Sequence, residues 1–512
     1  MNGAESLLRT AAASGIRVCF ANPGTTELPL VAAFDADTGI RPILCLFEGV
    51  CSGAADGYAR MSGNPAMTLL HLGPGFANGI ANFHNARRAR SAIFNVIGDH
   101  ASWHLPFDPP LASDIVSLAR PVSGWLRSAD AAGPLSRDAA EAIAAARSGT
   151  IATLIAPHDA QLRDGAVVEA VEDPPPLPRP SNAVVEASAR LLAQAGKGAL
   201  LLGGDGLLER GLRAAAHVSA ATGCTLWCDT FPARLERGGD LPSVERVPYF
   251  PERAIEAFSD LSTVVLAGTR PPVAFFGYPG VPGQIIGERT ETATLALADE
   301  DVGSALEDLA EAVGGAEGRS APAESSGRRD RPTGPLTPES LAAAVAGFQP
   351  EGAIVMDEGL TSAHAYFSAA TNAPRHTYLA LTGGAIGQGL PCATGAALAC
   401  PDRPVIALQA DGSGMYTLQA LWTQARESLD VTTVILANRG YQILAVELAR
   451  TGIVEPGPRC RSLTNFDLVP DWTQLARGFG VPAVRVEAAE DLWRELDRAL
   501  AEPGPHLIEV PI

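Results

Sequence analysis

Lysine is almost absent from this 512-residue sequence, in which Lys197 is the only one. It lies between Gly196 and Gly198, a context typical of a loop. This position argues against a Schiff-base lysine and against the lysine of a phosphate-binding P-loop. Pyridoxal phosphate chemistry and simple nucleotide hydrolysis are therefore disfavoured.

Positive charge is also scarce, since 38 Lys and Arg residues stand against 57 Asp and Glu residues, a net charge of −19. This balance disfavours nucleic acid and anionic membranes as partners. No apolar run reaches the ~18 residues of a membrane span. The first residues, MNGAESLLRT, lack the basic and apolar regions of a signal peptide. We therefore expect a cytoplasmic protein that binds neither nucleic acid nor membrane.

Paired cysteine motifs are missing, because none of the eight cysteines forms a C-x-x-C pair. Without a secretion signal, this spacing predicts reduced thiols that are mostly buried. Hydrophobic residues make up 46% of the chain, which is ample for buried cores. The length predicts roughly three domains.

Short apolar runs alternate with helical patterns along the chain, which indicates parallel α/β sheets. A Pro-rich stretch at 172–182 (EDPPPLPRPSN) and a polar Gly/Ser/Pro stretch at 313–335 interrupt this alternation and read as linkers. We predict three doubly wound parallel-sheet domains, at 1–170, 182–312 and 336–512. The expected strands are 16–20, 43–47, 67–71, 92–97, 199–202, 225–228, 264–267, 294–298, 353–356, 405–408, 431–436 and 506–510.

The stretch 405–444 carries the strongest functional pattern. A strand ends in Ala410-Asp411-Gly412-Ser413-Gly414, a helix is expected from Thr417, and the next strand ends in Asn438-Arg439-Gly440. This βαβ unit places Asp411 and Asn438 at the carboxyl ends of two strands. A carboxylate, an amide oxygen and a backbone carbonyl suit Mg²⁺ completed by phosphate oxygens. The plain alternative is an ordinary βαβ turn with a solvated Asp411.

This stretch resembles the diphosphate-binding motif of thiamine diphosphate (ThDP) enzymes, a GDG followed some two dozen residues later by NN. Ala410 and Ala437 replace the first Gly and the first Asn. Asn22 to Pro29 (NPGTTELP), Phe47 to Gly49 (FEG) and Ala54 to Ala59 (AADGYA) extend the likeness to the first domain. The chain is similar to benzoylformate decarboxylases and acetolactate synthase-like proteins. The resemblance implies a pyrimidine-binding first domain, a non-catalytic middle domain and a diphosphate-binding third domain.

The resemblance also implies an acid that exchanges a proton with the aminopyrimidine ring of ThDP, and Glu48 matches it. Glu48 follows the apolar run 43–47, and its alternative role is a helix-starting Glu that is stabilised by the helix dipole. Thr25 and His71 match substrate-contacting positions and complete the catalytic set. A buried structural histidine is the alternative for His71.

Further residues match cofactor contacts of the family. The Gly384 carbonyl is expected to accept from the aminopyrimidine, and Ile386, whose alternative is a plain core residue, is expected to hold ThDP bent. Tyr441 is expected beside the cofactor and the substrate. The expected diphosphate contacts are Thr361, Ser362, Gly412, Ser413 and Gly414, and the expected Mg²⁺ ligands are Asp411, Asn438 and the Gly440 carbonyl.

The sequence departs from the family in its middle domain. The second active-site histidine of benzoylformate decarboxylase has no obvious counterpart, and Pro271 to Tyr278 (PPVAFFGY) offers apolar and aromatic groups instead. His84, His100 and His104 are the candidate substitutes, and surface or capping roles are their alternative. The Gly203 to Gly206 turn reads as a plain strand–helix connection, so no FAD is expected.

These patterns predict a ThDP- and Mg²⁺-dependent enzyme that decarboxylates a 2-oxo acid and then protonates the product or joins it to a second carbonyl. The resemblance implies a homodimer or homotetramer with active sites at the subunit interface. Three alternatives stay open: a 2-hydroxyacyl-CoA lyase or oxalyl-CoA decarboxylase-type enzyme, a non-catalytic ThDP-binding subunit, and a nicotinamide or flavin oxidoreductase.

Overall fold

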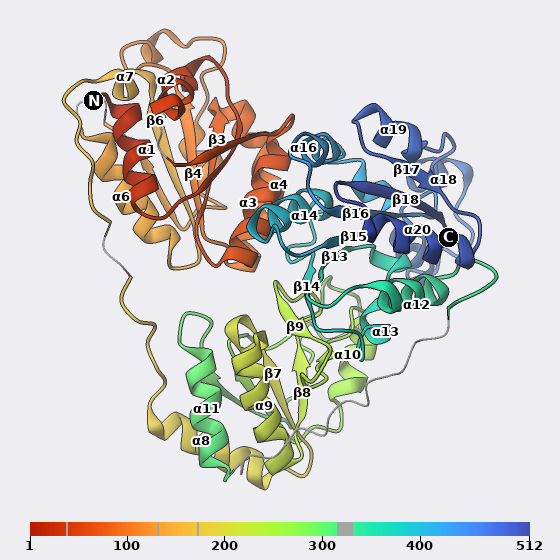
Figure 1. Cartoon of the computed structure of the whole chain (residues 1–512). Coiled ribbons are helices and arrows are strands. Elements are labelled where there is room, and N and C mark those ends of the chain that lie inside the picture. The colour runs from red at the N-terminus through yellow and green to blue at the C-terminus, as the bar shows by residue number, and fades with distance from the viewer. Residues whose placement is uncertain (37–38, 131–132, 172–173, 315–330) are drawn as a thin grey trace.

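A computed structural model describes residues 1–36, 39–130, 133–171, 174–314 and 331–512 of the chain. Three sheets with flanking helices build the molecule, and each forms the centre of one of the three groups in Figure 1. The start of the predicted 172–182 linker and most of the predicted 313–335 linker lie outside the described residues.

The N-terminal sheet is parallel throughout, with strand order β2-β1-β3-β4-β6-β5. β4 and β6 are buried at every position, as expected for strands covered by helices on both faces. Its strands are β1 Val18–Asn22, β2 Arg41–Leu44, β3 Ala66–His71, β4 Ile93–Asp99, β5 Trp125–Ser128 and β6 Ile151–Pro157. Its helices are α1 Gly3–Ala13, α2 Leu28–Ala33, α3 Glu48–Ser62, α4 Leu72–Ala89, α5 Ile115–Ala119, α6 Leu135–Ala146 and α7 His158–Leu162.

The second sheet has the order β10-β8-β7-β11-β12 and is also parallel. The strand expected at 294–298 is β12 at Glu291–Ala296, an edge strand whose first residues are polar and exposed. The other strands are β7 Gly198–Leu202, β8 Thr225–Cys228, β10 Glu245–Arg246 and β11 Thr263–Ala267. The helices are α8 Asn182–Gln194, α9 Glu209–Thr222, α10 Pro251–Phe258 and α11 Val302–Ala312.

The C-terminal sheet has the order β17-β18-β16-β15-β13-β14-β9. β9 comes from the middle of the chain and pairs antiparallel with β14, so the third sheet is parallel except at this edge. Its strands are β9 Leu235–Arg237, β13 Ile354–Glu358, β14 His376–Ala380, β15 Val405–Ala410, β16 Val431–Ala437, β17 Ala483–Arg485 and β18 His506–Pro511. Its helices are α12 Pro338–Phe348, α13 Tyr366–Ala369, α14 Gly389–Ala399, α15 Asp411–Gly414, α16 Ala420–Arg426, α17 Gln442–Arg450, α18 Pro458–Thr464, α19 Trp472–Gly478 and α20 Ala489–Ala501.

Glycines join the N-terminal and C-terminal groups where α3 packs on α14 (Figure 1). A Cβ on Gly57 would lie 2.0 Å from the Cys392 carbonyl oxygen, and a Cβ on Gly395 would lie 1.9 Å from that of Ala54. Any larger residue at either position would force the two helices apart. Gly63 then ends α3 in the left-handed conformation, with φ of 68°.

Two further expectations concern the state of the cysteines and the presence of membrane-spanning segments. All eight cysteines are free, and six of them are buried. None of the described helices is long and apolar enough to cross a membrane.

Candidate active site

Glu48 is the first residue of α3 and is 8% exposed. Asn78 on α4 donates from Nδ2 to Glu48 Oε2 over 2.9 Å. Two glycines of α4 let this helix approach, since a Cβ on Gly75 would lie 3.1 Å from Glu48 Oε1 and a Cβ on Gly79 would lie 3.3 Å from the Glu48 carbonyl oxygen. Among the described residues, Oε1 accepts no hydrogen bond. Glu48 is therefore a buried carboxylate with one oxygen left for a ligand.

His71 ends β3 and forms a pair with Glu27, a fully buried acid that was not among the predicted site residues. His71 Nδ1 lies 2.8 Å from Glu27 Oε2. The Gly24 backbone N–H and the Thr26 hydroxyl also donate to the Glu27 carboxylate, over 2.7 and 2.6 Å. A Cβ on Gly98 would lie 1.8 Å from Glu27 Oε1, so Gly98 leaves the space that Glu27 fills.

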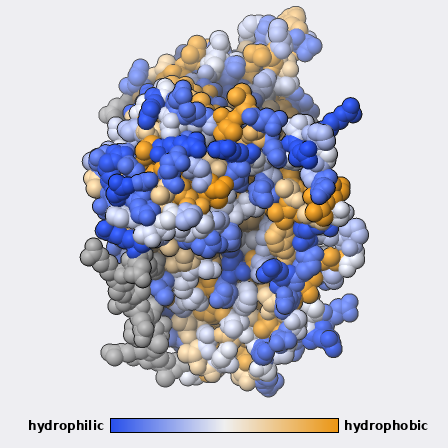
Figure 2. All heavy atoms as spheres, turned by 90° about the vertical axis from the view of Figure 1, so that its right-hand side faces the viewer, coloured by the Kyte–Doolittle hydropathy of each residue, from blue (hydrophilic) through white to orange (hydrophobic). Residues whose placement is uncertain are grey.

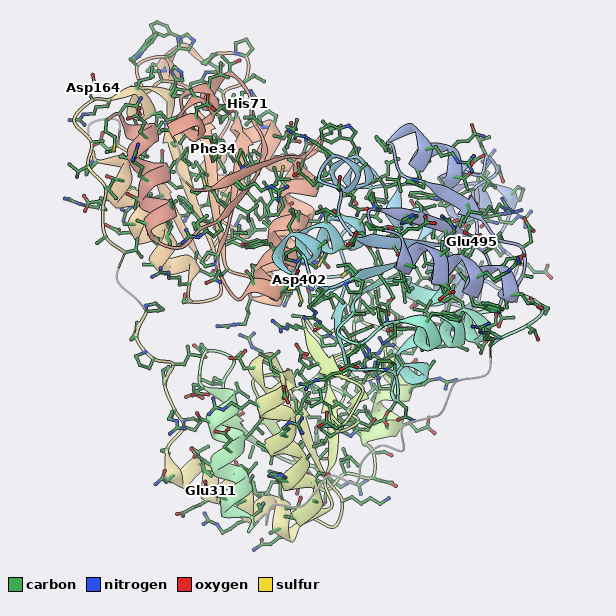
Figure 3. All side chains as sticks on the ribbon, in the orientation of Figure 1. Phe34, His71, Asp164, Glu311, Asp402 and Glu495 are labelled. Atoms are coloured by element: carbon green, nitrogen blue, oxygen red, sulfur yellow. The ribbon has the colours of Figure 1, made fainter. Side chains whose placement is uncertain are left out.

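The Glu27 pairing fixes the orientation of the His71 ring. If Nδ1 carries the proton shared with Glu27, Nε2 is the unprotonated nitrogen that can accept one. The His71 side chain is 24% exposed, so it is not an enclosed core histidine (Figure 3). Gly75 also brings the two predicted catalytic groups together, because its Cβ would touch both His71 Cβ at 3.3 Å and Glu48 Oε1.

Thr25 is exposed at the start of the short turn Thr25–Glu27 and takes no part in the side-chain hydrogen bonds of the described residues. It lies next to Thr26, whose hydroxyl is 3.3 Å from His71 Nδ1. The predicted substrate contact at Thr25 therefore stays a prediction, one residue from the histidine pair.

Asp411 and Asn438 follow the adjacent parallel strands β15 and β16. Asp411 is 1% exposed, so the alternative of a solvated aspartate is wrong. Its carboxylate accepts from the backbone N–H groups of Gly412 and Arg439, both over 2.8 Å. Burial nevertheless raises the pKa of Asp411 above its ordinary value. A buried carboxylate of this kind is stabilised when a cation lies beside it.

Asn438 and Ser362 complete this edge of the sheet. Asn438 Nδ2 donates to Ser362 Oγ over 3.2 Å, and Asn438 Oδ1 accepts from the Gly440 N–H over 3.2 Å. Arg439, which lies between Asn438 and Gly440, has a φ of 63°, so the loop turns sharply there. One carboxylate, one amide oxygen and a loop carbonyl form an oxygen-rich donor set that fits Mg²⁺, which Asp411, Asn438 and the Gly440 carbonyl would hold.

The turn after Asp411 is closely packed. A Cβ on Gly412 would lie 2.9 Å from the rings of both Tyr441 and Phe466, and these rings meet edge to face at 5.2 Å. Burial raises the pKa of Tyr441 to about 12. The Ser413 hydroxyl is already engaged, since it donates to the Ala410 carbonyl over 3.1 Å and accepts from Gln409 over 2.6 Å. Thr361 lies in the turn before Ser362, where its carbonyl is 2.8 Å from His364 Nδ1.

The loop that carries Gly384 and Ile386 is held by α4 of the same chain. Asn85 pairs with the Ala385 backbone twice, donating to its carbonyl over 2.7 Å and accepting from its N–H over 3.2 Å. His84 Nε2 lies 3.0 Å from the Gly383 carbonyl. Asn82 donates to both the Gly49 and Gly387 carbonyls, over 2.8 and 3.2 Å, and so joins the start of α3 to this loop.

Glu358, at the end of β13, fastens the loop from the other side and was not predicted. It is fully buried and accepts from the Gly387 N–H over 2.6 Å and from the Gly389 N–H. Desolvation on burial raises its pKa to about 7 despite these hydrogen bonds. Glu358 therefore holds the backbone that directly follows Ile386.

The raised pKa of Glu358 predicts a pH-dependent stability. Because the folded pKa lies above the ordinary value of 4.5, the contribution of Glu358 to stability is greatest below pH 4.5 and is lost as the pH rises towards 7, by on the order of 3 kcal/mol. Glu358→Gln cannot ionise, so we expect its Tm to fall less than that of the wild type between pH 5 and pH 8. Other buried acids contribute to the fall in Tm of both proteins. An equal fall in the two would therefore mean that Glu358 adds nothing, which would contradict this prediction.

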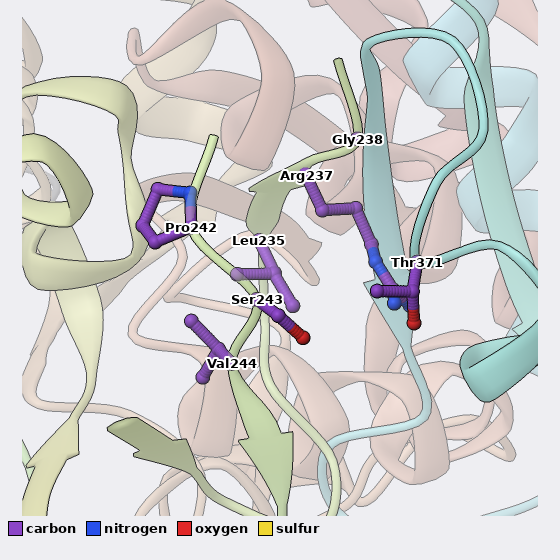
Figure 4. A pocket seen from close by; sticks show the side chains of 7 residues that line it. All are labelled: Leu235, Arg237, Gly238, Pro242, Ser243, Val244 and Thr371. Carbon is purple, nitrogen blue, oxygen red and sulfur yellow. The ribbon is translucent and has the colours of Figure 1, made fainter. Parts of the chain in front are cut away.

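The two groups of predicted residues remain separate within one chain. No hydrogen bond or ion pair among the described residues joins Glu48 or His71 to Asp411, Asn438 or Tyr441. A pocket between β9 and Thr371, which Arg237 and Ser243 line, contains none of the predicted site residues (Figure 4). The candidate site is therefore the pair of strand-end clusters, with the 383–389 loop anchored between them.

Comparison with known families agrees with this geometry. Residues 1–117 match the description "Thiamine pyrophosphate enzyme, N-terminal TPP binding domain", and residues 359–510 match "Thiamine pyrophosphate enzyme, C-terminal TPP binding domain". The chain belongs to the thiamine diphosphate-dependent enzymes. The predicted family, α/β fold class and enzyme class, a ThDP-dependent decarboxylase or carboligase, are confirmed.

Within this family the chain is 48% identical to "Putative acetolactate synthase large subunit IlvX" of Mycobacterium tuberculosis, over all of this chain and 99% of that protein. It is 29% identical to benzoylformate decarboxylase of Pseudomonas aeruginosa, over 97% of this chain and 96% of that protein. The structure of Rhodococcus jostii 4-hydroxybenzoylformate decarboxylase superimposes with a TM-score of 0.88 at 25% identity, covering 100% and 99% of the two chains.

Proposed function

We propose that this enzyme requires ThDP and Mg²⁺ and cleaves the bond between the carboxylate and the carbonyl carbon of a 2-oxo acid. CO₂ is released, and the remaining fragment leaves as an aldehyde or is joined to a second carbonyl. When bound, ThDP supplies a carbon nucleophile and an electron sink. The observation that carries the proposal is the buried Glu48 at the start of α3, with one oxygen free and His71 on the same side of Gly75.

Each residue group has a distinct task in this proposal. Glu48 holds or releases a proton at Oε1 against the cofactor ring. Glu27 orients His71 so that Nε2 exchanges a proton with the substrate or product. Asp411, Asn438 and the Gly440 carbonyl hold Mg²⁺, and Ser362 and Gly412 lie beside the diphosphate. Glu358 and Asn85 fix the loop that carries Gly384 and Ile386.

We further propose a cytoplasmic homodimer or homotetramer in which each active site combines Glu48 of one subunit with Asp411 of another. A shared site is supported by the lack, among the described residues of one chain, of any hydrogen bond or ion pair between these two clusters. Exposed apolar side chains also support assembly, and patches of them lie between polar groups on the face in Figure 2. In the C-terminal region Leu463 and Leu468 are 80% and 91% exposed.

The direct test is a panel of 2-oxo acids supplied with ThDP and Mg²⁺, in which CO₂ release and condensation products are measured separately. We expect turnover of at least one member, its loss on chelation, and its return when Mg²⁺ and ThDP are added together. An enzyme that binds ThDP but releases CO₂ from none of them would contradict the proposal and favour the acyl-CoA or non-catalytic alternative.

A further inference from the structure

Five aromatic side chains of the middle region form one continuous cluster: Phe231, Tyr249, Phe250, Phe275 and Phe276. Together with Tyr278, which is joined to Phe250 through the Arg450 guanidinium, they are called here the aromatic wall. Phe275 is at its centre, with ring centroids 5.0 Å from Phe276, 5.2 Å from Tyr249 and 5.9 Å from Phe231. Tyr249 in turn meets Phe250 edge to face at 5.1 Å. Such contacts hold the rings in fixed orientations.

The aromatic wall lies directly on the predicted cofactor loop. A Cβ on Gly384 would lie 2.7 Å from Phe275 Cζ, so the ring rests against the Gly384 backbone. Gly384 has φ of 77°, a conformation that glycine adopts readily. Asn85 of α4 holds the next residue of the same loop, since it donates to the Ala385 carbonyl over 2.7 Å. The wall therefore borders the position at which the cofactor ring is expected.

The other end of the wall is fastened to α17, the helix that begins two residues after Gly440. The Tyr278 hydroxyl donates to Glu447 Oε1 over 2.9 Å. The Arg450 guanidinium lies over the Phe250 and Tyr278 rings at 4.8 and 4.5 Å. The aromatic wall therefore extends from the predicted cofactor loop to α17, the helix that follows the predicted Mg²⁺ loop.

Two rings of the wall remain open to solvent. Phe275 is 41% exposed and Phe276 is 53% exposed. Arg450, the cation that lies over two rings of the wall, is paired with Glu252 at 2.8 Å and with Glu447 at 3.4 Å. The surface that Phe275 and Phe276 offer beside the loop is therefore apolar, and the charge of Arg450 is already paired.

We infer that Phe275 and Phe276 receive the side chain of the substrate and select 2-oxo acids with a branched aliphatic or aromatic side chain. The inference rests on the proposed function and narrows it. Pyruvate has only a methyl group to place against two rings, and a dicarboxylic 2-oxo acid would bring a second carboxylate against two apolar rings. Each additional methylene that is buried in such a pocket changes discrimination by about tenfold or more.

The test compares kcat/KM of the holoenzyme for pyruvate, 2-oxo-3-methylbutanoate, 2-oxo-4-methylpentanoate, phenylglyoxylate and 2-oxoglutarate. We expect at least about a tenfold preference for the best branched or aromatic member over pyruvate, and less activity still with 2-oxoglutarate. Phe276→Ala should lower this preference by raising KM for the large substrates while the kinetics with pyruvate change little. Leu177→Ala removes an apolar side chain of similar exposure, 48%, from a distant segment and serves as the control.

The outcomes separate the two proposals. Highest activity with pyruvate or 2-oxoglutarate, or an equal loss for all substrates in Phe276→Ala, would overturn the role of the wall and leave the proposed function standing. An enzyme that binds ThDP and turns over no 2-oxo acid would overturn both. If Phe276→Ala fails to fold, the same comparison is made with Phe276→Leu, which is expected to shift the preference from phenylglyoxylate to the branched substrates.

Discussion

Glu48→Gln is expected to lower kcat by about 100-fold or more, the scale of a lost proton-transfer group, without unfolding the protein. Glutamine keeps the shape of the side chain, and its oxygen can still accept from Asn78 Nδ2. It cannot exchange a proton at the position of Oε1. The measurement is steady-state turnover of the best 2-oxo acid, together with the affinity for ThDP.

The matched control for this variant is Glu339→Gln. Glu339 also lies in the first turn of a helix, α12, but it is exposed, and its ion-pair partner is His364, at 3.8 Å, which is not a predicted site residue. Its replacement should leave kcat unchanged. Full turnover in Glu48→Gln with ThDP bound would mean that Glu48 only starts α3, as the simpler interpretation of the sequence has it.

Asp411→Ala is expected to weaken binding of ThDP in the presence of Mg²⁺ by about 30-fold or more, the scale of removing one partner from a buried charge pair. The variant loses the carboxylate that is proposed to hold Mg²⁺, and it leaves the Gly412 and Arg439 N–H groups without their acceptor. Asp402→Ala is the control, because Asp402 is exposed and precedes β15 at the opposite end of that strand (Figure 3). Unchanged affinity in Asp411→Ala would remove the proposed metal site.

The same two variants test whether the site is shared between subunits. If it is, mixing unfolded Glu48→Gln and Asp411→Ala chains and refolding them together should restore about a quarter of wild-type activity. Random pairing makes half of the dimers mixed, and each mixed dimer then has one site with both residues intact. Refolded wild-type protein sets the reference. If each chain builds its own site, the mixture will stay as inactive as its components.

The sequence predicted the structure best where one stretch combined buried strands with polar residues at their ends. Asp411 and Asn438 were predicted at the ends of two buried strands, and these strands are adjacent and parallel. The run 405–408 extends to Ala410, and the helix expected from Thr417 begins at Ala420 after a looser turn. Buried strands are easy to detect because their whole length is apolar.

Elements with little apolar character were missed or displaced. The strand expected at 294–298 begins at Glu291, because one side of this edge strand faces solvent. β9 and β14, which pair across more than 130 positions, were not predicted, since a short strand whose partner is so distant leaves no local pattern. β5 and β6 were also not named, although β6 is buried at every position and only Thr153 interrupts its apolar residues 151–155.

The hydrogen-bond partners of the predicted site residues were also missed, because these partners lie far away in the sequence. Glu27 belongs to the Asn22 to Pro29 motif, but nothing in the sequence showed that it contacts His71, 44 positions later. Glu358 and Asn85 act on the backbone of the 383–389 loop, so their role is visible only when the three segments are placed together. A motif shows which chemistry is present, whereas the groups that orient it depend on long-range packing.

The glycine contact between α3 and α14 limits how this enzyme can be recombined with its relatives. Gly57 and Gly395 fix the spacing of the two helices, and Asn82 bridges the Gly49 and Gly387 carbonyls a short distance away. An N-terminal half taken from a relative with a bulkier residue at position 57 would tilt the start of α3, which carries Glu48. Through the Asn82 amide, it would also displace the 383–389 loop. The two halves are therefore not interchangeable modules, and changes at this seam are tolerated only as matched pairs.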